Sequence, residues 1–414
     1  MVKYKYLVLF HSIKDNKEFK SFVSNNFFTY EYLFKSFKNV YIVNVNNLRF
    51  TQKKANLDIK ILKNFFPNLN LKFYSLNKFI HLHKFLKKKK IVGIKSFGTT
   101  YSELIINIFL KFYDVRLLTI GNTGHRNYGT TISSSRIKLF KNYLIKKLAH
   151  KLTVFLSMVG LVRKIDIKFI SNPDYIRFNK NRITNRIANF LNLLYAKKLI
   201  LINSRAYDIF LKNKFKIKND YITVLDEQLN EPQWTRFSGV KKKKNIILHY
   251  KKFNIYLKKL SKVLKKKVII CIHPNDNLDE KKKFFKNFKV LKYKTREYIY
   301  KSYLVVFFGS SAIIDAILLN KNITTIRSKI LDKNQISSSM YYVEGINAPI
   351  STIDNIENLN LTKDFLTKNK IIKNTKEIKK DYKKFLKKYV CAGTKNTLGV
   401  EKIIKTIKLL YKLN

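Results

Sequence analysis

The chain has 414 residues and a formal net charge of +59. Hydrophobic residues make up 46% of it and aromatic residues 14%, which excludes a disordered chain, and the length suits two α/β domains better than one core. Only 12 of the 85 basic residues are Arg, the lysines are spread along the chain, and the abundant Asn, Ile, Phe and Tyr match A/T-rich codons. Because dedicated nucleic-acid binders rely on Arg for bidentate contacts, we do not expect nucleic acid as a partner. An anionic membrane surface remains a candidate partner.

The cysteine content and the lengths of the apolar runs indicate the cellular compartment of the protein. Cys271 and Cys391 do not make a disulfide framework, and no CxxC pattern exists, so we expect no metal and no cofactor. The apolar N-terminal run is too short for a signal sequence, so we expect a cytoplasmic protein. The run Leu152–Val162 is too short to span a bilayer, and we expect a buried helix or strand there. The alternative is a monotopic segment on the inner face of the cytoplasmic membrane.

The first half of the chain alternates strand-like and helix-like segments. Its predicted strands are Tyr6–Phe10, Val40–Val45, Ile91–Ile94, Arg116–Ile120 and Lys198–Ile202. Its predicted helices are Phe27–Phe37, Tyr101–Phe112 and Ile187–Tyr195. This alternation indicates a parallel sheet with right-handed crossovers.

The second half repeats the same alternation. Its predicted strands are Tyr221–Leu225, Val268–Ile272, Lys289–Leu291, Leu304–Phe308 and Ile323–Ile326. Its predicted helices are Phe253–Leu264, Lys281–Phe288, Arg296–Ser302, Ser311–Leu319, Asp381–Val390 and Val400–Leu413. We therefore predict an α/β chain with two Rossmann-like domains, residues 1–205 and 220–375, that face each other across a cleft. Helices in residues 376–414 are expected to pack back toward the first domain. This is the GT-B architecture, which also hosts sugar epimerases.

Two apolar runs of the second half end in polar clusters. Val268–Ile272 delivers His273 and Pro274, and Leu304–Phe308 delivers Gly309, Ser310 and Ser311. In open α/β sheets ligands bind beyond the carboxyl ends of the strands, so we expect these two loops to lie side by side at one site. Backbone N–H groups after a glycine, two hydroxyls and an imidazole are suitable donors to a phosphate. The alternative is an ordinary helix N-cap with a structural histidine.

Other candidate residues follow other strands. Asp226 and Glu227 end the first strand of the second half, where a carboxylate could deprotonate an acceptor hydroxyl or cap a turn. On the acceptor side, the candidates are His11 after the first strand, and His125 and Arg126 after a first-domain strand.

The pair His273-Pro274 and Ser310-Ser311, in this order and at these strand ends, resembles the HP and SS motifs of bacterial sialyltransferases and polysialyltransferases. The resemblance covers residues 221–326 and extends more broadly to GT-B enzymes of surface-polysaccharide synthesis. It implies that His273, Ser310 and Ser311 contact the phosphate of a CMP-activated donor. The acidic Asp/Glu-Asp-Gly motif of that family is absent here, so Asp226 and Glu227 are substitute candidates for the general base.

These observations predict a metal-independent glycosyltransferase of capsule or lipopolysaccharide synthesis. A nucleotide-sugar donor, with CMP-linked sialic acid or a related nonulosonic acid as the first choice, would give its sugar to a hydroxyl of a glycan or glycolipid acceptor. The alternatives are a CDP-glycerol-type polymer transferase and a sugar-nucleotide epimerase of the same fold. An alternative of another class is a non-catalytic basic protein that binds nucleic acid or membrane.

Overall fold

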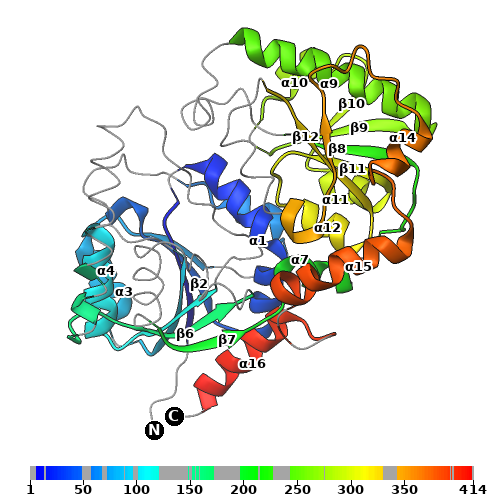
Figure 1. Ribbon diagram of the computed structural model, residues 1–414. Helices are drawn as coiled ribbons and strands as arrows, with labels where there is room; N and C mark the ends of the chain where they lie inside the picture. Colours follow the sequence, from blue (N-terminus) through cyan, green and yellow to red (C-terminus); the bar gives the residue numbers. More distant parts are fainter. Residues whose placement is uncertain are drawn as a thin grey trace. The chain divides into compact units, whose positions relative to one another are not determined.

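The computed structural model describes the chain in segments that build two compact units. The described residues are 6–13, 15–48, 57–67, 72–87, 89–96, 101–120, 148, 152–153, 155–157, 159–171, 196–212, 215–226, 243–274, 276–329, 343–391, 393 and 396–412. Among them, unit 1 holds the chain up to Ile209 together with the segment from Cys391, and unit 2 holds Phe210–Val390. Figure 1 labels the elements of both units.

Unit 1 is built on a seven-stranded sheet in the order β3-β2-β1-β4-β5-β6-β7. Its strands are β1 (Tyr6–His11), β2 (Val40–Asn44), β3 (Lys72–Ser75), β4 (Ile91–Ser96), β5 (Arg116–Ile120), β6 (Ile165–Ile170) and β7 (Ala196–Leu201). Its helices are α1 (Asn16–Ser36), η1 (Asn46–Leu48), α2 (Lys60–Phe65), α3 (Phe79–Leu86), α4 (Tyr101–Phe112), α7 (Arg205–Lys212), which runs into unit 2, and α16 (Gly399–Lys412). Every neighbouring pair is parallel, so all the strands end at one edge.

Unit 2 has a six-stranded sheet in the order β10-β9-β8-β11-β12-β13, and it is also parallel throughout. Its strands are β8 (Tyr221–Leu225), β9 (Lys267–Ile272), β10 (Lys289–Lys292), β11 (Ser302–Phe307), β12 (Asn322–Arg327) and β13 (Ile350–Thr352). Its helices are α9 (Lys243–Leu264), α10 (Leu278–Phe284), α11 (Thr295–Tyr300), α12 (Ile313–Leu318), α14 (Lys363–Lys368), α15 (Thr375–Phe385) and η3 (Leu386–Val390). The expectation of an α/β chain with two Rossmann-like parallel sheets is confirmed.

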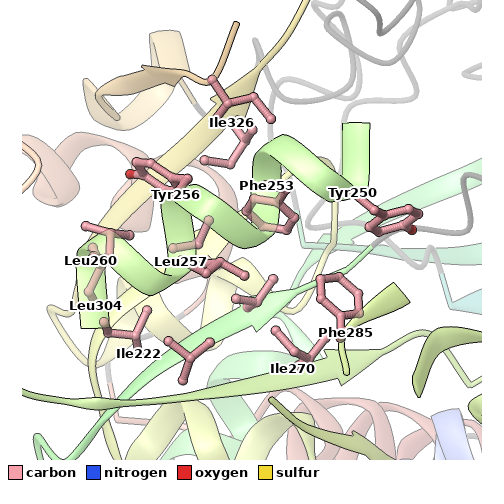
Figure 2. Close-up of a cluster of buried hydrophobic side chains, with 14 of the residues drawn as sticks. Ile222, Tyr250, Phe253, Tyr256, Leu257, Leu260, Ile270, Phe285, Leu304 and Ile326 are labelled. Carbon is pink, nitrogen blue, oxygen red and sulfur yellow. The ribbon is translucent and has the colours of Figure 1, made fainter. Parts of the chain in front are cut away.

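The core of unit 2 forms where α9 packs on the sheet. Ile246, Tyr250, Phe253, Leu257 and Leu260 are all buried, and their alternating spacing of four and three residues lays them along one face of the helix. Figure 2 shows the last four of these side chains beside apolar residues of the sheet strands, including Ile222, Ile270 and Leu304. Because the central strands are buried on both faces, they are nearly continuous apolar runs, as is typical of parallel sheets.

The C-terminal helices join different units. In unit 2, α15 begins with a capping box in which Asn374 and Glu377 satisfy each other's backbone N–H groups. In unit 1, the buried Asp208 accepts hydrogen bonds from the backbone N–H groups of Gly399 and Val400 at the start of α16. Desolvation raises the pKa of Asp208 to about 6. The predicted domain bounds and the predicted cleft stay predictions.

The run Leu152–Val162 differs from its main expectation of a buried helix or strand. Its described residues include helical turns, but Phe155, Val159 and Leu161 are 59%, 55% and 61% exposed. The expectation of burial is wrong for these side chains. The buried described residues of the run are Thr153, Ser157 and Val162, and Leu156 is half-buried.

Candidate functional site

The candidate donor site lies at the carboxyl edge of the unit 2 sheet. β9 ends before His273 and β11 ends before the turn Gly309–Ser311, so both predicted loops emerge at this edge. They are not on neighbouring strands, because β8 runs between β9 and β11. With about 4.8 Å between parallel strands, the two strand ends lie about 10 Å apart. The expectation that the two loops lie side by side is therefore corrected: they flank the end of β8.

The turn after β9 holds His273 at the surface. The backbone N–H of Asp276 donates to the carbonyl of His273 at 2.9 Å, which closes a tight turn around Pro274. Lys292 donates to the carbonyl of Asp276 at 2.9 Å and fixes the far side of that turn. His273 is exposed and Pro274 is half-buried, so the imidazole is accessible to a ligand.

The turn after β11 is also accessible, although one of its hydroxyls has a local role. Gly309 and Ser310 are half-buried and Ser311 is exposed. The Ser310 hydroxyl accepts a hydrogen bond from the backbone N–H of Ala312 at 3.3 Å, as a capping serine would. The carboxylate of Asp315 at the start of α12 accepts a hydrogen bond from Arg296 at 3.0 Å. This ion pair neutralises its charge. The turn therefore presents an exposed hydroxyl donor at Ser311, and the carboxylate of Asp315, four residues later, is paired with Arg296.

A buried ion network underlies this edge. Lys281 is 1% exposed and lies between Asp226, with which it forms an ion pair, and Asp276 at 3.7 Å. The ammonium of Lys281 also donates to the Tyr250 hydroxyl at 2.6 Å, and that hydroxyl donates to Asp226 at 3.3 Å. A fully buried carboxylate with a cationic partner is a poor acceptor of a substrate proton, so this geometry favours a structural role for Asp226.

Sequence reasoning missed two buried residues here. Lys281 sits in a basic run that suggests a solvated helix, and the available signal was its four-residue spacing from the buried Phe285. His249 is fully buried, and neither of its ring nitrogens has a hydrogen-bond partner among the residues that the structure describes. Its ring lies 5.5 Å from that of Phe308, the residue that leads into the Gly309 turn. Burial lowers the pKa of His249 to about 3, so the imidazole is neutral.

The carboxyl edge of the unit 1 sheet carries the acceptor-side candidate His11. This residue ends β1, is 1% exposed, and shares a 2.8 Å hydrogen bond between its Nε2 and the Tyr30 hydroxyl. Its Nδ1 has no hydrogen-bond partner in the described segments, and burial lowers the pKa of the imidazole to about 3. The loop after β1 is tied to the end of β2, because Asn44 bonds both backbone groups of Ile13. Asn46 accepts a hydrogen bond from Ser12 at 3.2 Å, and its buried Nδ2 has no partner among the described residues.

The remaining candidates lie outside the described residues. These are Glu227, His125 and Arg126. Among the residues that the structure describes, no group of three His, Cys, Asp or Glu side chains is arranged to hold a metal ion.

No protein-family model matches the sequence, and no curated protein matches it. Solved structures do match. A protein assigned as a UDP-N-acetylglucosamine 2-epimerase, from Listeria monocytogenes, aligns over 99% of this chain and 98% of its own, with 10% sequence identity and a TM-score of 0.53. The wall teichoic acid polymerase TagF aligns over 100% of this chain and 90% of its own, with 13% identity and a TM-score of 0.50.

This chain has a GT-B-like fold. The likeness extends over nearly the whole length of each aligned chain, and both sheets of this chain are parallel and Rossmann-like. The coarser part of the resemblance predicted from the sequence is thereby confirmed. Membership of the sialyltransferase family stays a prediction.

Proposed function

We propose that this chain is a glycosyltransferase whose nucleotide-sugar donor binds at the carboxyl edge of the unit 2 sheet. The observation that carries the proposal is the pair of accessible turns, His273 and Gly309–Ser311, on either side of the β8 end. A spacing of about 10 Å between two strand ends suits a ligand that carries a phosphate and a group on each side of it. Ligands of open parallel sheets bind at this edge.

In this proposal the turns stabilise the leaving nucleotide. The Ser311 hydroxyl and the backbone N–H groups of the Gly309 turn donate to phosphate oxygens, and His273 donates from the opposite side as negative charge develops. The ion network of Asp226 and Lys281 holds the floor of the site rigid. Glu227, the next residue, is the remaining candidate base for the acceptor hydroxyl.

The acceptor is proposed to use the unit 1 edge. Within the described part of the chain, the buried His11 Nδ1 and Asn46 Nδ2 have no hydrogen-bond partner, and a sugar hydroxyl would satisfy either of them. Both groups are uncharged, which suits a neutral acceptor hydroxyl. His125 and Arg126 stay candidates for the same role.

For the donor, we propose CMP linked to sialic acid or a related nonulosonic acid, because of the His-Pro and Ser-Ser motifs. CDP-glycerol is the second choice, because a teichoic acid polymerase shares the fold. The acceptor would be a surface glycan or glycolipid on the cytoplasmic side of the membrane.

Thermal unfolding in the presence of CMP, CDP and UDP tests the proposal. A bound nucleotide raises the unfolding midpoint, and one present at about 100 times its Kd adds about 2.7 kcal/mol. The double substitution Ser310→Ala with Ser311→Ala is expected to abolish the rise. Thr367→Ala is the matched control, because its exposed hydroxyl bonds only within α14. If no nucleotide shifts the wild type while DNA does, the chain is a basic binding protein and the proposal is wrong.

A sugar-nucleotide epimerase is the alternative enzyme on this fold, and a structural likeness at 10% sequence identity does not separate the two activities. Product analysis separates them. A transferase releases free nucleotide only when an acceptor glycan is present, whereas an epimerase interconverts two sugar nucleotides without one.

A further inference from the structure

The described residues of the run 152–162 form an inverted amphipathic segment in unit 1. Leu152, Phe155, Val159 and Leu161 are between 39% and 61% exposed, while the hydroxyl side chains on the other side are fully buried. A solvent-facing helix normally buries its apolar side chains and exposes its polar ones. This arrangement therefore presents an apolar surface outward.

The end of this segment is fixed rather than frayed. Gly160 has φ of +79°, and the N–H of Leu161 donates to the carbonyl of Leu156 at 2.8 Å, as in a Schellman motif. The N–H of Gly160 donates to the carbonyl of Ser157 at 3.4 Å. The cap holds Leu161 outward next to Val159.

The end of α4 adds a second apolar projection at the same place. Phe112 is 78% exposed, and two residues later Asp114 forms a 2.8 Å ion pair with Arg163. That ion pair ties the turn after α4 to the turn after Leu161. The next strands, β5 and β6, are neighbours, so both turns lie at the amino edge of the sheet.

Basic side chains accompany this surface. Lys111 and Lys198 are exposed and Lys164 is half-buried. The nearby acidic groups are paired: Asp114 with Arg163, and Asp166 with Arg163, Arg116 and Lys197. An apolar projection with free positive charge around it matches the composition of segments that lie in a bilayer interface.

We propose that Phe112, Phe155, Val159 and Leu161 form a membrane-docking ridge that enters the headgroup region of a bilayer containing anionic lipids. No helix among the described residues is long and apolar enough to cross a membrane, which leaves docking on the surface. A second copy of the chain is the less suitable occupant, because each copy carries a net charge of +59 and copies repel. Anionic lipid attracts the same charge.

Co-sedimentation of the full chain with vesicles tests the ridge. Vesicles of phosphatidylcholine with one third phosphatidylglycerol are expected to bind the wild type, and pure phosphatidylcholine vesicles to bind it more weakly. The double substitution Phe155→Ser with Leu161→Ser is expected to weaken binding by at least about tenfold, because two apolar side chains no longer leave water. Ile217→Ser is the matched control, since Ile217 is 58% exposed on unit 2 and is expected to leave binding unchanged.

A fluorescence measurement keeps the proposal testable if the double variant does not fold. Phe155→Trp in a Trp234→Phe background is expected to be quenched by brominated lipid in the anionic vesicles. Absence of that quenching would overturn the ridge. So would vesicle binding that high salt abolishes equally in the wild type and the double variant, because spread lysines would then account for it. A wild-type dimer that the double variant converts to a monomer would assign the ridge to a second copy instead.

Discussion

The carboxyl edges of the two sheets carry buried polar groups of different kinds on the same topology. In unit 1 the groups around the end of β1 are neutral, an imidazole at His11 and amides at Asn44 and Asn46, although the buried Lys95 lies near the end of the neighbouring β4. Among the described residues, His11 Nδ1 and Asn46 Nδ2 have no hydrogen-bond partner. In unit 2 they are charged, with Lys281 held between Asp226 and Asp276. Buried charges that are paired are held in place by their partners, whereas a neutral polar group without a partner can still form a hydrogen bond with a ligand. The difference is the basis for the proposed donor site over a rigid floor in unit 2 and the proposed acceptor site in unit 1.

Replacing the buried Lys281 of unit 2 should have the largest effect on the free energy of unfolding. Lys281→Met is expected to lower the free energy of unfolding by about 3–5 kcal/mol, because the Asp226 carboxylate stays buried without its cation. Lys282→Met is the control: its side chain is 57% exposed, and a change within about 0.5 kcal/mol is expected. Chemical denaturation of both variants measures the contrast. A loss below about 1 kcal/mol for Lys281→Met would mean that the network is not a rigid floor.

In unit 1, the start of α16 at Gly399 packs closely against the backbone of Asn203, which follows β7. A Cβ added to Gly399 would meet the carbonyl oxygen of Asn203 far inside van der Waals contact, and backbone cannot move aside as a side chain can. Gly399→Ala is expected to cost about 1–3 kcal/mol by displacing the start of α16. Thermal unfolding measures the loss, and hydrogen exchange should localise it to α16. Wild-type protection of that helix in the variant would contradict the prediction.

The two buried histidines should differ in their response to substitution and pH. The folded-state pKa of His249 is about 3, below the ordinary value of 6.5, so its contribution to stability is present above pH 6.5 and is lost as the pH falls toward 3. From about pH 7 to about pH 5 this loss amounts to about 2 kcal/mol. His249→Leu should remove this part of the pH dependence and should be at least as stable at neutral pH, because no hydrogen bond is broken.

His11→Leu provides the comparison for unit 1. It removes the same kind of pH dependence but leaves the Tyr30 hydroxyl without its imidazole partner, which costs about 1–3 kcal/mol at neutral pH. Urea denaturation at several pH values measures both variants. Equal stability changes at neutral pH would show that the orphaned nitrogens of His249 have partners in solution.

The smallest stability effect is expected at Ser310. Loss of its hydrogen bond from Ala312 should cost about 0.5–1 kcal/mol in Ser310→Ala, as for other caps. A variant that loses nucleotide binding with only this small stability change would support contact with the ligand. A variant that keeps full binding would make Ser310 a cap and place the binding role on Ser311 and the backbone.

Much of the fold was predictable because the sequences of buried parallel strands are nearly continuous apolar runs. The bounds of α4, β5 and β8 agree with the sequence prediction. The prediction omitted β3, whose four residues KFYS alternate between exposed and half-buried at the sheet edge and so lack an apolar run. It also began α9 ten residues late, because the lysines of its first turns mask the helical spacing.

The candidate site was less predictable, because strand order is set by tertiary packing and not by local pattern. The carboxyl ends that bear His273 and Ser310 were identified, but no local signal placed β8 between them. Burial of Lys281 was hidden in a run of three lysines, of which only one faces inward. The spacing of a helix indicates which face is buried only when the packed neighbour is known.

The chain leaves unit 1, forms unit 2 and then returns to unit 1, and this order has a consequence for biosynthesis. Unit 2 lies within the sequence of unit 1, since Phe210–Val390 interrupts it and α16 returns to it. During translation the hydrogen bonds from Gly399 and Val400 to the Asp208 carboxylate can therefore form only after the start of α16 has left the ribosome. All of Phe210–Val390 is therefore synthesised before the segment that completes unit 1.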